Sequence, residues 1–155
     1  LRFRLPDEGP EIAAAAIVCI AGGHVAVLLN RLRLFGLARA LRTRPIVAWS
    51  AGAMAIAERV VLFHDHPPQG AGNAELFDAG LGFVRNAVFL PHAATRLASR
   101  DPQRVALLAR RMAPAVCYTL DDGDALHWRR GRLASAAGSQ RLTRSGRFAP
   151  AGSAA

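Results

Sequence analysis

The stretch of residues 46–54 constrains the fold of this chain more than any other segment. An apolar run at residues 46–49 predicts a short buried strand, and Ser50 follows it directly. Small residues at 51–53 stand where a helix is predicted to begin, so the chain can turn sharply there and expose the hydroxyl beside backbone N–H groups. Two interpretations remain open: Ser50 is an exposed nucleophile, or it only caps the helix.

Length and composition indicate one folded domain. The chain has 155 residues, 52% of them hydrophobic, which is enough to bury a core. No apolar run approaches the ~20 residues that span a bilayer, and Asp7, Glu8 and Glu11 interrupt the N-terminus where a signal peptide would be apolar. Cys19 and Cys117 both lie in apolar runs, which predicts buried free thiols in a reducing compartment. We therefore expect a cytoplasmic protein, and the lack of a long apolar run predicts no membrane contact.

The positive charge is concentrated near the C-terminus. The net charge is +9 and every basic residue is arginine; six arginines and no acidic residue follow Asp124. Residues 131–155 are rich in Ala, Ser, Gly and Arg, and we expect a solvated, partly disordered basic tail. No nucleic-acid motif accompanies these arginines, so a nucleic-acid partner is not expected.

Between the ends, strand and helix signals alternate. We expect a loop or cut end at 1–11, a buried strand at 13–20, a helix from 25 that Gly36 interrupts, strands at 46–49, 87–90 and 115–120, a helix after Asp101-Pro102, and a hairpin turn at Asp122-Gly123. This alternation predicts an α/β domain over residues 12–130, with a mostly parallel sheet, helices on both of its faces and a C-terminal hairpin.

Three residues could perform nucleophilic catalysis, and their order in the chain is Ser50, Asp65 and His92. A serine needs a base to remove its proton, and the base works best when a carboxylate orients it. Asp65 lies in a loop rich in Pro and Gly, and His92 follows the predicted strand at 87–90. Because strand ends of an open α/β sheet share one edge, we expect Ser50, Asp65 and His92 to converge there.

Several motifs together resemble one known family. They are Ala48-Trp49-Ser50-Ala51-Gly52-Ala53, the loop His64-Asp65-His66-Pro67, Pro91-His92, the Gly22-Gly23 turn and Leu120-Asp121-Asp122-Gly123-Asp124-Ala125. In this combination residues 12–128 resemble the S51 serine peptidases, the aspartyl dipeptidase and cyanophycinase family. The resemblance implies a class I glutamine amidotransferase-like, flavodoxin-like fold.

The resemblance also implies roles for individual residues. Ser50 would be the nucleophile, His92 the base and Asp65 its orienting acid, and the backbone N–H groups of Gly23 and Ala51 would hold the oxyanion. The substrate would be a small peptide or isopeptide, with no cofactor. Acidic residues beside the scissile bond are common in this family, and candidate substrate contacts here are His24, Trp49, Arg85 and Arg96.

Departures from the family pattern support an alternative function. His24 stands where the family has Asn or Asp, and Ala48 replaces a glycine, so the chain could instead be a non-catalytic amidotransferase-like domain that binds a ligand or protein. The histidines at 24, 64, 66 and 92 do not form a recognisable metal motif, and no metal is expected. We also expect an N-terminally incomplete sheet, and hence a homo-oligomer or poor solubility.

Overall fold

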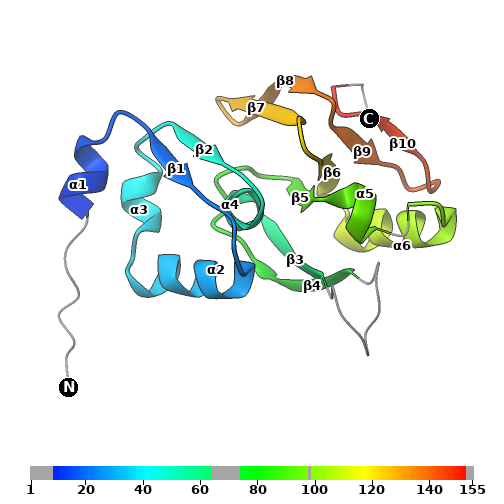
Figure 1. Ribbon diagram of the computed structural model, residues 1–155, viewed down its shortest axis with the longest axis horizontal. Helices are drawn as coiled ribbons and strands as arrows, with labels where there is room; N and C mark the ends of the chain where they lie inside the picture. The colour runs from blue at the N-terminus through cyan, green and yellow to red at the C-terminus, as the bar shows by residue number, and fades with distance from the viewer. Residues whose placement is uncertain (1–8, 64–73, 98, 153–155) are drawn as a thin grey trace.

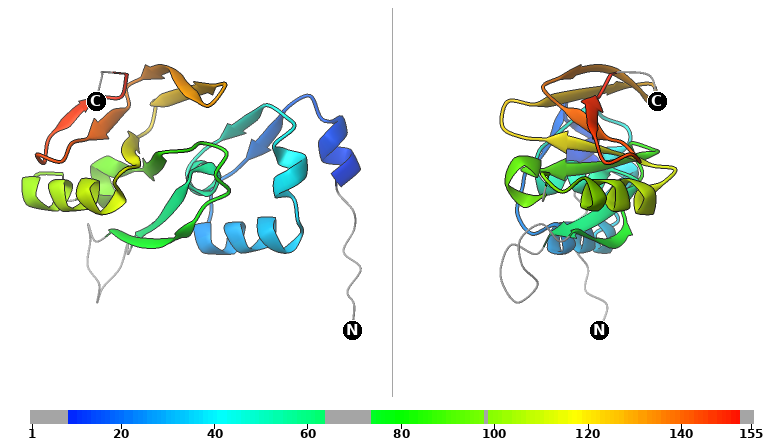
Figure 2. Two further views of the ribbon diagram at one scale, coloured as in Figure 1. Left: turned by 180° about the vertical axis from the view of Figure 1, so that it is seen from behind. Right: turned by 90° about the vertical axis from the view of Figure 1, so that its right-hand side faces the viewer.

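The computed structural model describes residues 9–63, 74–97 and 99–152. The helices are α1 (Gly9–Ala14), α2 (Val25–Leu34), α3 (Ala38–Leu41), α4 (Ala51–Ile56), α5 (Ala93–Arg96) and α6 (Pro102–Met112). The strands are β1 (Val18–Ile20), β2 (Ile46–Ala48), β3 (Arg59–Phe63), β4 (Ala74–Ala79), β5 (Ala87–Pro91), β6 (Val116–Leu120), β7 (Ala125–Arg129), β8 (Arg132–Ala137), β9 (Gln140–Leu142) and β10 (Phe148–Pro150). Figure 1 shows α1, α2 and α3 at one end of an elongated molecule and β9, β10 and α6 at the other, and Figure 2 shows the same elongation from behind.

The N-terminal end of the molecule is built on a parallel strand pair. β1 and β2 pair in register, with Val18 opposite Ile46 and Ile20 opposite Ala48. Helices α2 and α4 contribute to a core cluster that also contains Ile20. The cluster includes the buried residues Val25, Leu29, Leu32, Leu41, Met54 and Val60. The predicted helix interruption is confirmed, because α2 ends at Leu34 and Gly36 has φ 66°.

The C-terminal end is built on a four-stranded sheet in the order β10-β9-β6-β5. β5 and β6 are parallel, whereas β9 pairs antiparallel with both β6 and β10. Helix α6 begins as the sequence predicts: the Asp101 side chain accepts hydrogen bonds from two backbone N–H groups of the first turn, and Pro102 follows it. Its buried stripe packs on β5 and β6. The residues of the stripe are Val105, Leu108, Ala109 and Met112.

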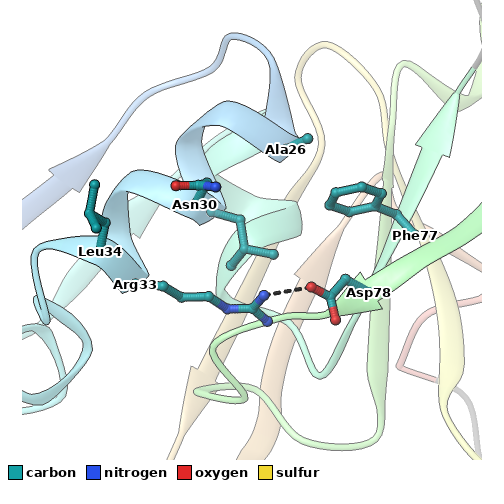
Figure 3. Close-up of a pocket in the computed structure, with 7 residues that line it drawn as sticks. Ala26, Asn30, Arg33, Leu34, Phe77 and Asp78 are labelled. Carbon is teal, nitrogen blue, oxygen red and sulfur yellow. Dashed lines mark hydrogen bonds and ion pairs between the residues drawn. The ribbon is translucent and has the colours of Figure 1, made fainter.

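Two antiparallel hairpins complete the fold. β3 pairs with β4, and β7 pairs with β8. The β3–β4 hairpin is tied to α2 by an ion pair between the Arg33 guanidinium and the Asp78 carboxylate (Figure 3). The same guanidinium also donates a hydrogen bond to the Ala79 carbonyl. The β7–β8 hairpin extends from β6 toward β2 (Figure 1).

The expected fold class is wrong in its main feature. The described strands form one mixed four-stranded sheet, one parallel pair and two antiparallel pairs, not one mostly parallel sheet with helices on both faces. Short connections explain much of the difference: only two residues join β7 to β8, whereas a parallel pair needs a crossover of about a dozen residues. β2 and β5, which the prediction places in one sheet, belong to different sheets among the described residues.

The structure also corrects three local expectations: the loop at 1–11, the strand at 13–20 and the basic tail at 131–155. Residues 9–14 form helix α1, and the strand predicted at 13–20 is only Val18–Ile20. The alanine run at 13–16 explains the error, because alanine favours helix and a short apolar run does not distinguish helix from strand. The segment expected to be a basic tail contributes β8, β9 and β10, and it buries Leu142.

Candidate active site

Ser50 lies in the turn between β2 and α4, and its backbone conformation is unusual. It has φ 51° and ψ −125°, in a region that residues with a side chain rarely adopt. The turn is closed by hydrogen bonds from the Trp49 N–H to the Ile20 carbonyl at 3.2 Å and from the Gly52 N–H to the Trp49 carbonyl at 2.9 Å. Such a conformation costs about 1–3 kcal/mol and persists only where the surrounding structure holds it.

Two glycines allow the backbone of β1 to approach this turn. A Cβ atom at Gly52 would lie 2.2 Å from the Ile20 carbonyl oxygen, so only glycine fits there. A Cβ atom at Gly22 would lie 3.2 Å from the Ser50 Oγ. Gly22 therefore lies close to the Ser50 side chain.

His92 lies at the carboxyl end of β5, where the sequence predicts it. Its backbone adopts the left-handed conformation with φ 56°, and its N–H donates to the Leu120 carbonyl of β6 at 3.0 Å. The imidazole is 44% exposed, and its Nδ1 lies 3.9 Å from the Oδ1 of Asp122. The ring is therefore accessible from solvent, with a carboxylate at one of its nitrogens.

Three aspartates follow β6, in a segment for which the sequence predicts only a hairpin turn. Asp121 accepts a hydrogen bond from the Ala94 N–H of α5 at 2.9 Å, and Asp124 accepts one from the Asp121 N–H at 3.0 Å. Asp122 is left fully exposed beside His92. The signal was present in the sequence, because acidic residues directly after one strand lie at the same edge as the end of its parallel neighbour.

The elements that carry Ser50 and His92 pack against each other. Ala53 of α4 and Phe89 of β5 belong to one core cluster, and Ala48 of β2 packs against it. Asp65, the predicted orienting acid, lies outside the described residues, as do His64 and His66. Of the predicted triad, the structure therefore describes Ser50 and His92, and no hydrogen bond joins these two side chains among the described residues.

The four predicted substrate contacts are placed differently. His24 is exposed at the start of α2, directly after the Gly22-Gly23 turn, and Trp49 is 51% exposed beside Ser50. Arg96 ends α5 and its guanidinium lies 5.7 Å from the centre of the Phe63 ring. Arg85 precedes β5 whereas His92 follows it, so the structure places Arg85 at the other end of that strand.

The cysteines differ in accessibility. Burial raises the pKa of the Cys117 thiol to about 12, which keeps it protonated at neutral pH, and thiols in that form are poor nucleophiles. Cys19, predicted to be buried, is exposed on β1. Within the described ranges, no three His, Cys, Asp or Glu side chains gather as a metal site would require. The same part of the chain contains no helix with the length and apolar character needed to cross a membrane.

Comparison with known proteins supports the family that the motifs around Ser50 resemble. A search of curated proteins finds no match to the chain. The family model of Peptidase family S51 matches residues 7–135, which covers most of the chain and includes Ser50 and His92. The chain therefore belongs to peptidase family S51.

Proposed function

We propose that this protein is a serine hydrolase that cleaves a peptide or isopeptide bond with Ser50 as its nucleophile. Membership in peptidase family S51 supports peptidase or hydrolase activity. The single observation that carries the serine assignment is the backbone of Ser50, which is strained at a strand-to-helix turn. A nucleophile elbow has this geometry, and a helix cap does not need it.

The chemistry would proceed through an acyl-enzyme. His92 accepts the proton of Ser50 as its Oγ attacks the carbonyl carbon, and His92 then donates that proton to the leaving amine. Water, activated by the same imidazole, releases the acyl group. The backbone N–H groups of Gly23 and Ala51 would stabilise the oxyanion, at about 3 kcal/mol for each donor. The proximity of the neighbouring Gly22 to the Ser50 side chain supports this arrangement.

Two carboxylates are candidates for the acid that orients His92. The family resemblance favours Asp65. Asp122 lies 3.9 Å from the imidazole, but its full exposure weakens the interaction, because water screens exposed charges. We propose Asp65 as the orienting acid, with Asp122 as an electrostatic neighbour of the imidazole.

Substitution of each carboxylate separates these roles. Asp65→Asn should lower kcat by about three to four orders of magnitude, as loss of an orienting acid does in other triads. Asp122→Asn should lower it by less than about tenfold. Glu11→Gln, which changes an exposed carboxylate on α1, is the matched control for the change in net charge. The opposite ranking of Asp65→Asn and Asp122→Asn would assign the orienting role to Asp122.

The substrate proposed is a short peptide with an acidic residue beside the scissile bond. Arg96 is the better placed of the two arginine candidates, because it lies four residues after His92 on α5. A hydrolysis screen of aspartyl dipeptides against β-aspartyl-arginine tests the substrate class. In the same assay Ser50→Ala should lower kcat/KM by at least about a thousandfold. Wild-type activity equal to that of Ser50→Ala on every substrate would favour a non-catalytic binding domain.

A further inference from the structure

A cavity of about 740 Å³ is lined by residues of β2, α4, β5 and the β7–β8 hairpin. Strand β2 contributes Ile46, Val47 and Ala48, α4 contributes Ala53, β5 contributes Phe89, and the hairpin contributes Leu126 and Trp128. This volume is typical of small-molecule sites, which are mostly apolar with a few polar groups. The aromatic rings and aliphatic side chains of this cavity meet that description.

Three arginines are among the residues that line the cavity. Arg42 and Arg44 precede β2, and Arg130 lies in the turn between β7 and β8, far away in the sequence. None of the three has an ion-pair partner among the described residues. Arg42 donates to the Leu81 carbonyl at 3.0 Å, and its guanidinium lies 5.0 Å from the centre of the Phe83 ring.

Arg44 is the least satisfied of these groups. Its Nε atom is buried and has no hydrogen-bond partner among the described residues. A buried polar atom without a partner costs free energy, and like charges that line one cavity repel each other. An anion bound between the guanidinium groups would remove both costs, and a guanidinium can bind carboxylate or phosphate with two parallel hydrogen bonds.

Among the described residues that line the cavity, the one acidic side chain is Asp124, and it forms no ion pair with these arginines. Asp124 precedes β7 whereas Arg130 follows it, and the Asp124 carboxylate already accepts from the Asp121 N–H. Strand β2 likewise separates Arg44 from Ser50, because one precedes it and the other follows it. Arg44 is therefore separated by the length of β2 from the turn that carries Ser50.

We propose that this cavity binds an organic anion, with its carboxylate or phosphate group between Arg42, Arg44 and Arg130 and its apolar or aromatic body against Phe89 and Trp128. The site uses neither Ser50 nor His92, so it does not depend on the proposed hydrolase activity.

Fluorescence titration of the full chain tests the proposal. The sequence has two tryptophans, so Trp49→Phe leaves Trp128 as the reporter inside the cavity. The probes are 3-phenylpropanoate, phenyl phosphate and the neutral 3-phenylpropanamide. At least one anion should bind about tenfold more tightly than the amide, and the tighter anion identifies the carboxylate or phosphate class. Equal binding of the amide and both anions overturns the proposal.

Variants locate the anion. Arg44→Gln and Arg130→Gln should each weaken binding of the preferred anion by about tenfold. Arg144→Gln is the matched control, because it removes the same charge from an exposed position in the β9–β10 turn. A thermal melt of each variant confirms that it is folded. Equal loss of affinity in all three variants, or no loss in the first two, contradicts the proposed site.

Discussion

Replacing Gly52 by alanine should destabilise the protein, although alanine favours helix. The added Cβ would lie 2.2 Å from the Ile20 carbonyl oxygen and 2.9 Å from the Ala21 carbonyl oxygen, both of them backbone atoms. A carbon and an oxygen approach to about 3.3 Å at closest, so β1 and α4 must separate by roughly 1 Å. Overpacking of this kind costs up to about 3 kcal/mol, whereas the better helix propensity returns about 1 kcal/mol. We expect a net loss of about 2 kcal/mol.

Chemical denaturation in urea, followed by circular dichroism, measures this loss directly. For a domain of this size the same change lowers Tm by roughly 4–8 °C. Gly152→Ala is the matched control, because no atom lies within 4 Å of its added Cβ, and it should change the free energy of unfolding by less than about 0.5 kcal/mol. If Gly52→Ala proves as stable as the control, the close approach of β1 to α4 is wrong.

Three further predictions follow from individual contacts. In the folded protein Cys19 should react with a thiol reagent such as DTNB within minutes at pH 8, whereas the buried Cys117 should react only after unfolding. The hydrogen bond from Arg33 lowers the pKa of Asp78. The interaction therefore stabilises the folded protein above about pH 4, and this stabilisation is lost as the pH falls through the folded-state pKa of Asp78. The difference in unfolding free energy between wild type and Asp78→Asn should shrink over the same pH range. Asp101→Ala should cost about 1 kcal/mol in the same unfolding measurement, because it removes the cap of α6, and an unchanged midpoint would contradict that role.

Local signals in the sequence predicted several elements correctly. Gly36 ends a helix because its backbone reaches φ 66°, and Asp101-Pro102 begins one because both residues suit the first turn. The strand, turn and helix around Ser50 also follow from the local pattern. These features depend on interactions within a few residues.

The pairing of strands could not be predicted in the same way. Whether β2 pairs with β5 depends on contacts between residues about forty positions apart, and the alternation of strands and helices does not encode it. The turn at Asp122-Gly123 was identified, but β6 pairs with β5 and β9, and the hairpin partner of β7 is β8. The proximity of Asp122 to His92 follows from that tertiary arrangement.

Covalent labelling tests directly whether Ser50 is a nucleophile. The full chain is treated with a fluorophosphonate, and the adduct is counted by intact-protein mass spectrometry and located by peptide mapping. We expect one adduct, on Ser50, that is absent from Ser50→Ala. The adduct should be retained in Ser135→Ala, which removes an exposed hydroxyl on β8. An adduct that survives Ser50→Ala, or a folded wild-type protein that forms none, would contradict the assignment of Ser50 as the nucleophile.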